Sequence, residues 1–360
     1  MQPPQPKKQG LSVWLVILCV GGVGLAVASG MWYLRSGGAG AIPGITQPVT
    51  SAPNVIPPTP VPTSVGGEHR SPQPAVSPLL FGTNLILNNS SDQVLTSTAT
   101  QQQLQQLHVQ IIRMPIRDFA PESVNVQAAE MIKQLGATPL VILHGAADAD
   151  ALAVGQRVIP DMNRIFGKSV VYYEFGNEND LEGVSAYLYA TRWNSIIPQF
   201  KALALNGKFI GPVKSDYNHA YISTFLAMAR PHPDVISWHE YTCNAFAANA
   251  LCMANLSHWT THVQDARATM KATIGTNVPI MITEWNYAPD ASGADNKHND
   301  SAFMQAWTIK AIKTLADSHV FASMQYACTH PIMSLVTSTG ALTAQGDAFQ
   351  SAYKQLMKTN

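Results

Sequence analysis

The sequence predicts a (β/α)8 barrel, and the alternation of two kinds of segment carries this prediction. Short apolar stretches, rich in β-branched and aromatic residues, recur at intervals of roughly 25–45 residues. Eight of them are found, beginning at Phe81, Val109, Thr138, Val170, Lys208, Asp234, Val278 and His319. Strands that alternate with helices imply a parallel sheet, and eight such units in about 280 residues fit a closed barrel.

The segments between these stretches have the pattern of helices, as in NVQAAEMIKQLG and HWTTHVQDARATMKATIG. Gly136 and Gly275 stand where such helices should end. A doubly wound open sheet is the alternative, and it would place a glycine-rich phosphate loop after the first strand. The segment GTNLILNNSS is not such a loop, so the barrel is favoured.

The first 34 residues have a different character. Residues 11–34 carry no charge and are mostly apolar, and about 20 such residues suffice to span a bilayer. Lys7 and Lys8 precede this run, which favours a short cytoplasmic tail at residues 1–10 and export of the remainder. A cleaved signal peptide is the alternative, because residues 26–28 have the A-x-A form of a cleavage site. Either reading places the rest of the chain outside the cytoplasm, with the membrane as a partner if the segment is an anchor.

Residues 35–78 form the next region, rich in Pro, Gly, Ser and Thr. Residues 36–78 alone contain ten prolines, a composition typical of an extended, semi-rigid linker. We expect one folded barrel domain to occupy residues 79–360. The whole chain has 22 basic and 22 acidic residues, so it lacks the positive charge of a nucleic-acid-binding protein.

The cysteines favour a disulfide over a metal site. Cys243 and Cys252 flank the insert NAFAANAL in the exported part, where disulfides persist. Cys328 lies in an apolar strand and is most simply a buried thiol. No Cys-x-x-Cys motif occurs, which disfavours structural zinc, and we expect no metal ion or other cofactor.

Functional side chains of such barrels gather where the strands end. A single polar side chain at a strand end could be a solvated charge or a hydrogen-bonding group with a structural role. The convergence of many such side chains at the ends of eight strands is hard to explain by packing. The candidates are Asn84, Arg113, His144, Asn177, Glu178, His239, Tyr241, Glu284, Trp285 and Tyr326.

Two glutamates form the sharpest pair. Glu178 ends the fourth predicted strand and Glu284 ends the seventh, so they should face each other across the barrel mouth. Cleavage of a glycosidic bond needs two carboxyl groups in different protonation states, which lie about 5–5.5 Å apart in a retaining enzyme.

These motifs resemble those of clan A glycoside hydrolases, which are retaining (β/α)8 enzymes. The resemblance rests on Asn177-Glu178 at the fourth strand and Glu284 at the seventh, supported by IIRMPI at the second and WHEY at the sixth. GNEN and TEWN are similar to the xylosidase, iduronidase and arabinofuranosidase branches, and the resemblance covers about residues 80–350.

The resemblance implies a role for each matching residue. Glu178 would be the acid/base and Glu284 the nucleophile, while Asn177 would bond the 2-hydroxyl of the sugar. Arg113 would lie beside Glu284 and keep it ionised. Tyr241 would hydrogen-bond the same carboxylate.

Other residues are expected in supporting positions. His239 would line the site near the acid/base, and Tyr326 would form the floor beneath the sugar or pack the barrel top. His144 and Trp285 either contact the substrate or only surround it. Glu174 should point into the barrel below Glu178, paired with Arg113 or Arg117.

The sequence departs from those branches because it leaves no room for their usual extra β-sandwich domain, so the sugar and the linkage stay open. The polar loop YAPDASGADNKHNDS after Glu284 could form a rim or a lid. Asp290, Asp295 and Asp300 in it do not have the spacing of a calcium loop, which favours a solvated loop.

Three functions are compatible with these features. The first is a membrane-tethered retaining glycosidase acting on an oligo- or polysaccharide outside the cytoplasm. The second is a non-catalytic carbohydrate-binding protein on a barrel scaffold, which the full set of site residues disfavours. The third is a metal hydrolase built on His144, His239, Glu240 and His330, which lacks a His-x-His motif at the first strand.

Overall fold

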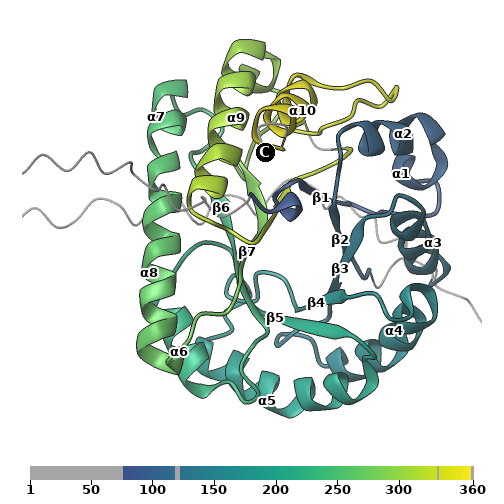
Figure 1. The fold of residues 1–360 in the computed structure, drawn as a ribbon, viewed down its shortest axis with the longest axis vertical. Helices are drawn as coiled ribbons and strands as arrows, with labels where there is room; N and C mark the ends of the chain where they lie inside the picture. The colour runs from purple at the N-terminus through teal and green to yellow at the C-terminus, as the bar shows by residue number, and fades with distance from the viewer. Residues whose placement is uncertain (1–75, 118–121, 331, 358–360) are drawn as a thin grey trace, which may run out of the picture. The chain divides into compact units, whose positions relative to one another are not determined.

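Eight parallel strands close into a barrel in chain order, because β1 pairs with both β2 and β8 (Figure 1). The structure is a computed structural model that describes residues 76–117, 122–330 and 332–357. Each predicted apolar stretch contains one strand, so the predicted barrel is confirmed. The strands are β1 (Gly82–Asn84), β2 (Ile111–Pro115), β3 (Thr138–Leu143), β4 (Val171–Phe175), β5 (Gly207–Lys214), β6 (Val235–Tyr241), β7 (Ile280–Asn286) and β8 (Ala322–Gln325).

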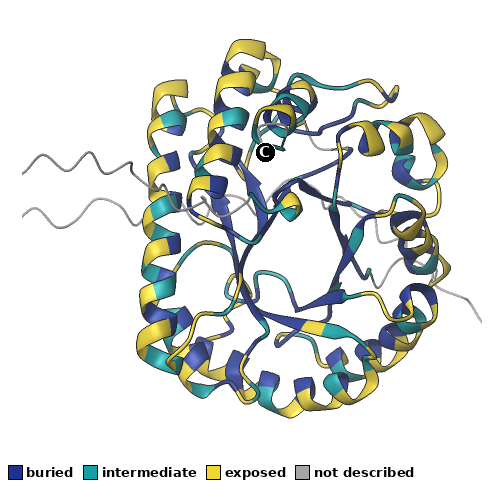
Figure 2. Ribbon diagram, in the orientation of Figure 1, coloured by how far each residue is buried: buried dark blue, intermediate teal, exposed yellow. Residues whose placement is uncertain are grey.

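Helices surround the barrel and bury the side that faces the strands (Figure 2). Gly275 caps the end of its helix with φ 74°, and Gly136 follows another helix with φ 71°, so both glycines mark helix ends as predicted. The helices are η1 (Pro78–Leu80), α1 (Gln93–Thr96), α2 (Thr98–Gln106), α3 (Glu122–Gln134), α4 (Ala151–Phe166), α5 (Ala186–Leu203), α6 (His219–Met228), α7 (Asn249–Ala254), α8 (Leu256–Ile274), η2 (Asn296–Asn299), α9 (Ser301–Asp317) and α10 (Ala344–Met357).

The expected cytoplasmic tail, the apolar segment at residues 11–34 and nearly all of the linker lie outside the described residues. Within residues 76–117, 122–330 and 332–357, no helix has both the length and the apolar character needed to cross a bilayer.

A small apolar layer fills the inside of the barrel and determines which side chains lie above it. Ile111 of β2, Tyr172 of β4 and Val235 of β6 belong to this layer. Side chains alternate along a strand, so the residues two positions further on also point inward, toward the carboxyl ends. Arg113 and Glu174 are the two polar residues that follow Ile111 and Tyr172 in this way.

Strand β7 departs from simple alternation. Met281 lies in the inner layer, and the pairing of β7 with β8 shifts register between Ile282 and Trp285. Glu284, three residues after Met281, therefore faces the barrel interior, where strict alternation would have turned it outward. The irregularity aims the second predicted carboxylate at the barrel mouth.

Candidate active site

Arg113 is the central cation of the site. Its side chain is 1% exposed, and its Nε lies 2.6 Å from Oε2 of Glu174 while its Nη1 lies 2.6 Å from Oε1 of Glu284. Nη1 also donates to Oδ1 of Asn84 at 2.9 Å, and Nη2 donates to Oδ1 of Asn177 at 2.5 Å. All three guanidinium nitrogens thus have oxygen partners, and the planar fork holds four side chains from three strands and one loop.

Glu174 lies fully buried below the barrel mouth, as expected. Of the two candidate partners it pairs with Arg113, whereas Arg117 donates to the main-chain oxygen of Ile86 at 3.1 Å. Its Oε1 accepts a second hydrogen bond from Ser237 Oγ at 3.2 Å. A buried charge needs such partners, so Glu174 supports Arg113 from the inside of the barrel.

Glu284 is the buried carboxylate at the barrel mouth. Tyr241 donates its hydroxyl to Oε2 at 3.1 Å, and Nδ1 of His239 lies 3.7 Å from the same oxygen. Burial alone would raise the pKa of Glu284, but His239 and Arg113, with hydrogen bonds from Arg113 and Tyr241, hold this pKa below its ordinary value. The environment therefore keeps Glu284 ionised.

Glu178 occupies a different environment, just beyond the end of β4. Its side chain is 26% exposed, and its Oε1 lies 2.7 Å from Nδ1 of His239. Its main chain has φ 49°, in the left-handed region, and its N–H donates to the main-chain oxygen of Val213 at 2.9 Å. Non-glycine residues in this region are often held there for a functional reason.

The turn that carries Glu178 depends on close backbone packing. Gly176 has φ 86°, and a Cβ on it would lie 2.4 Å from Oδ1 of Asn179. That oxygen accepts the N–H of Ala146 at 2.9 Å and so ties the loop after β4 to the loop after β3. The glycine and the second asparagine of GNEN are therefore needed to shape the turn.

His239 links the two predicted catalytic carboxyl groups. One ligand-capable atom from each of Glu178, His239 and Glu284 lies within 4.8 Å of the others. Burial would lower the pKa of His239, but the charge of Glu284 and the hydrogen bond and charge of Glu178 raise it. The histidine thus favours its protonated form between two carboxyl groups.

The same three residues could in principle ligate a metal ion. The guanidinium of Arg113, 2.6 Å from Glu284, opposes a second cation there because like charges at this range repel strongly. The four residues of the metal-hydrolase alternative do not converge. Glu240 bonds to Trp238 and His262 at 2.7 and 2.8 Å on the outer side of the barrel, and His330 lies 3.1 Å from Asp92.

A cavity of about 380 Å³ lies over the carboxyl ends of β1 to β4 and reaches Glu284 and Tyr326. This volume falls in the range of small-molecule sites, about 300–1,000 Å³. Asn84, Arg113, Asn177, Glu178 and His144 also line it.

Tyr326 and His144 are the two cavity residues for which the sequence left more than one role open. Burial and then the charge of Glu284 raise the pKa of Tyr326, which follows β8. His144 places Nδ1 2.8 Å from Asp150. Both side chains face the space that a substrate would occupy.

Two acidic residues of the cavity were not predicted from the sequence. Asp148 and Glu182 line it from the loops after β3 and β4. They belong to polar loops without periodicity or a recognised motif, so no sequence signal distinguishes them from solvated loop residues.

Trp285 does not line the cavity. It is fully buried on the outer side of β7, with ring centroids 6.3 Å from Trp259 and 6.0 Å from Trp307. Because neighbouring residues of a strand point to opposite sides, the register that directs Glu284 inward directs Trp285 toward α8 and α9. The expectation that Trp285 contacts a substrate in the cavity is therefore wrong.

The cysteines have the expected surroundings, and Asp290 and Asp300 are exposed as expected. Asp295 is instead 2% exposed and pairs with the buried Lys297 at 3.0 Å, so the expectation that it is solvated is wrong. Cys243 and Cys252 form a disulfide, and Cys328 is a buried free thiol. Asp290 accepts the N–H of Ala245 at 2.8 Å, and Asp300 caps α9 by accepting the N–H of Phe303 at 3.0 Å. Each of these carboxylates serves a separate protein group.

Comparison with known proteins gives a structural likeness without a sequence match. No protein-family model and no curated protein matches the chain. An α-L-arabinofuranosidase of family GH51 from Thermotoga petrophila superposes with TM-score 0.60 at 14% identity, covering 77% of this chain and 70% of that one. A family 51 α-L-arabinofuranosidase from Bifidobacterium longum superposes with TM-score 0.59 at 11% identity, covering 78% and 74%.

A GH5-4 broad-specificity endoglucanase from an uncultured bacterium also matches, with TM-score 0.53 at 12% identity, covering 78% of this chain and 95% of that one. At these identities the likeness concerns the fold. The chain is thus a (β/α)8 barrel whose structure matches GH51 arabinofuranosidases and other clan A glycoside hydrolases.

Proposed function

We propose that this protein is a retaining glycoside hydrolase with Glu178 as acid/base and Glu284 as nucleophile. One observation carries the proposal: an oxygen of Glu178 and an oxygen of Glu284 lie within 4.8 Å of each other, while the two carboxyl groups have different environments. This spacing is close to the 5–5.5 Å of retaining enzymes and well below the 6.5–9.5 Å of inverting ones. Glu284 is buried and held ionised, whereas Glu178 is partly exposed at the cavity.

In the first step a carboxylate oxygen of Glu284 attacks the anomeric carbon. The bond from that carbon to the leaving oxygen breaks. The proton held between Nδ1 of His239 and Oε1 of Glu178, 2.7 Å apart, passes through Glu178 to this oxygen, which leaves as an alcohol. Asn177 directs Oδ1 toward Arg113, which leaves its Nδ2 as the donor for the 2-hydroxyl of the sugar. This bond strengthens as positive charge develops on the ring.

In the second step water restores both carboxyl groups. Glu178, now ionised, takes a proton from a water molecule whose oxygen attacks the anomeric carbon. The bond between that carbon and Glu284 breaks, and the sugar leaves with the configuration it had at the start.

The substrate of this reaction is an oligo- or polysaccharide or another glycoside, and we place the reaction outside the cytoplasm. The disulfide Cys243–Cys252 supports this location because such bonds persist in oxidising compartments. The uncharged run at residues 11–34 supports it as an anchor or a signal segment. Protease treatment of intact cells should digest the barrel domain, and protection of this domain would argue against the location.

A panel of substrates tests the activity. Aryl β-xylosides, β-glucosides and α-L-arabinofuranosides are incubated with the protein alongside arabinan, arabinoxylan, xyloglucan and β-glucan. Glu284→Gln should lower turnover of any accepted substrate by at least about 10³-fold. Glu130→Gln is the matched control, because Glu130 is exposed on α3, and it should leave turnover unchanged.

Two further measurements test the roles. Proton NMR of the first product should show retention of configuration, and inversion would exclude Glu284 as a nucleophile. Glu178→Ala should lose activity and regain part of it with azide, an anion that can attack the glycosyl-enzyme without a general base. Full activity of Glu284→Gln would refute the proposal.

A further inference from the structure

A second hollow lies at the carboxyl end of the barrel, formed by the loop after β6 and the loop after β7. Its volume is about 330 Å³, and its lining includes the ring of Phe246 and the polar side chains of Asn249, Asn296 and Asp300. The catalytic cavity is lined from β1 to β4, Glu284 and Tyr326, so the two hollows are built from different loops.

Phe246 is the unusual residue of this hollow. Its exposed fraction is 76%, the largest among the large apolar side chains of the described residues, yet its neighbour Ala245 is fully buried. Phe246 shares its hollow with Asn249, Asn296 and Asp300, so an apolar ring face and polar groups are offered to the same ligand.

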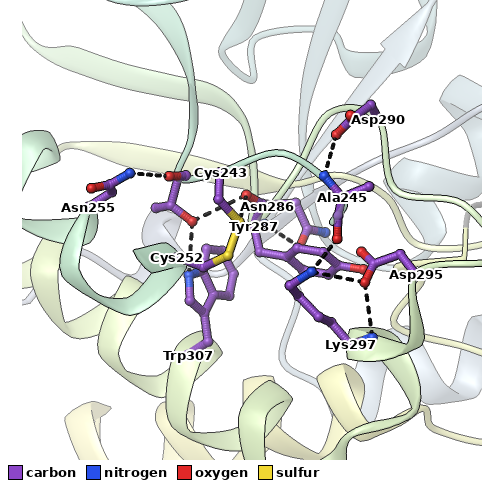
Figure 3. The surroundings of a disulfide bond; sticks show 11 residues. Cys243, Ala245, Cys252, Asn255, Asn286, Tyr287, Asp290, Asp295, Lys297 and Trp307 are labelled. Carbon is purple, nitrogen blue, oxygen red and sulfur yellow. Dashed lines mark hydrogen bonds and ion pairs between the residues drawn. A yellow bond between two sulfur atoms is a disulfide. The ribbon is translucent and has the colours of Figure 1, made fainter. Parts of the chain in front are cut away.

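The segment that carries Phe246 is held on both sides (Figure 3). The N–H of Ala245 donates to Asp290 at 2.8 Å, and the main-chain oxygen of Ala245 accepts from Nζ of Lys297. Lys297 is itself buried and pairs with Asp295 at 3.0 Å. These contacts fix the main chain directly before the ring.

The disulfide and the strand ends fix the rest of the segment. Cys243 is bonded to Cys252 and donates its N–H to the main-chain oxygen of Tyr287 at 2.8 Å (Figure 3). The segment begins two residues after Tyr241, which contacts Glu284, and Tyr287 lies three residues after Glu284. The exposed ring is therefore anchored to the same two strand ends that position the nucleophile.

We propose that Phe246 and the polar side chains that line the same hollow form a distal glycan-binding subsite, separate from the cavity at the carboxyl pair. An aromatic face packs against the apolar C–H side of a sugar ring, and amide or carboxylate groups hydrogen-bond its hydroxyls. Because the main chain directly before the ring is already held, binding would cost little ordering entropy in this segment. The ligand class is a soluble polysaccharide chain that extends beyond the sugar at the carboxyl groups, so this inference rests on the proposed function.

Phe246→Ala tests the subsite in the full-length protein. Because the side chain is exposed, the fold should be unaffected, which circular dichroism and thermal melting can verify. Retardation in native gels that contain arabinoxylan, xyloglucan or β-glucan should fall about fivefold to tenfold for the best of these polymers. Hydrolysis of the accepted aryl glycoside should be unchanged, since that substrate is too short to reach the ring.

Two variants control this experiment. Phe246→Trp keeps an aromatic face and should retain retardation. Leu205→Ala removes another exposed apolar side chain, 71% exposed and just before β5 at the opposite end of the strands, and should have no effect. Equal retardation of Phe246→Ala and the unmodified protein in every gel would overturn the subsite, as would no retardation of the unmodified protein in any gel.

The experiment separates this inference from the proposed function. Turnover of the aryl glycoside without any effect of Phe246→Ala on polymer binding would overturn the subsite and leave the hydrolase in place. Retardation that depends on Phe246, in a protein without glycosidase activity, would support the subsite and refute the hydrolase.

Discussion

Arg113 and Glu284 form a buried ion pair in which Nη1 lies 2.6 Å from Oε1. The same guanidinium neutralises Glu174, also at 2.6 Å, so one cation serves two buried carboxylates. The pair of carboxylates and the single arginine leave one negative charge in excess inside the barrel mouth. His239, 3.7 Å from Glu284, is placed to offset this charge when it is protonated, which is why the pKa of His239 is raised.

Removal of Arg113 should therefore destabilise the fold. Arg113→Met leaves two buried carboxylates without their cation, and breaking a buried pair in this way costs about 3–5 kcal/mol. Glu284 is stabilising in the native protein above its unfolded-state pKa because its folded-state pKa is lowered. Without Arg113, burial should instead raise the folded-state pKa of Glu284, so that its ionisation at neutral pH destabilises the fold. The loss in the free energy of unfolding should therefore be largest at pH 7 and smaller at pH 5, as measured by urea unfolding.

Arg164→Met is the control for this prediction. Arg164 forms an exposed pair with Asp161 on α4, at 2.9 Å, and pairs of this kind contribute at most about 1 kcal/mol. If both variants lost a similar free energy of unfolding, the buried network around Arg113 would contribute no more to stability than an exposed ion pair.

Tyr241 should set the acid limb of activity. Its hydroxyl donates to Glu284 at 3.1 Å, and a donor to a carboxylate favours the ionised form. Tyr241→Phe should raise the pKa of Glu284 and so move the acid limb of kcat/KM to higher pH, with a loss of about tenfold at the optimum. The pH profile of kcat/KM for the accepted aryl glycoside measures both effects.

Tyr217→Phe makes the same chemical change away from the cavity. Tyr217 donates to Asp265 at 2.6 Å on the helix side of the barrel. Its variant should keep the unmodified pH profile. An acid limb that does not move in Tyr241→Phe would contradict the role given to this hydroxyl.

Much of the barrel and of its polar centre could be predicted from the sequence, because both depend on periodic and local signals. Alternation of strand and helix patterns predicted the eight strands, and period-two alternation placed Glu174 beneath Glu178. The choice between Arg113 and Arg117 as its partner could not be made in this way, since Arg117 lies two residues beyond the end of β2, where the alternation of the strand no longer applies.

The positions that were missed depend on departures from regularity. Trp285 and Glu284 are neighbours, and the register shifts of β7 against β6 and β8 decide which of them faces the barrel interior. Asp148 and Glu182 line the cavity from loops whose paths are set by tertiary packing. The exposure of Phe246 likewise depends on the contacts of Ala245 and is not visible in the sequence.

His239 should make stability depend on pH near neutrality. Its folded-state pKa is raised above the ordinary value of 6.5, so its contribution is fully present below pH 6.5 and is lost as the pH rises through the folded-state pKa. The free energy of unfolding should therefore fall between pH 6 and pH 9. His239→Gln should make this dependence shallower in urea unfolding at a series of pH values.

His262 provides the comparison for this measurement. Its pKa is also raised, with burial opposing the effect of Glu240, so it contributes a dependence of the same sign. His262 is less buried than His239, and His262→Gln should therefore remove a smaller part of the slope. If His239→Gln keeps the whole slope, the histidine does not hold its proton between the two carboxyl groups.

The disulfide should stabilise the segment after β6 by restricting the unfolded chain. Cys243 and Cys252 are nine residues apart, and closure of a loop of this size contributes about 2–3 kcal/mol. The double variant Cys243→Ser/Cys252→Ser should lose this amount in urea unfolding without reductant, and the unmodified protein with reductant should unfold like the variant. Cys328→Ser, which changes only the buried thiol, should keep the sensitivity to reductant. Because Asp290 and Lys297 still hold Ala245, the double variant should retain polysaccharide binding through Phe246; loss of both stability and binding would mean that the disulfide alone orders the segment.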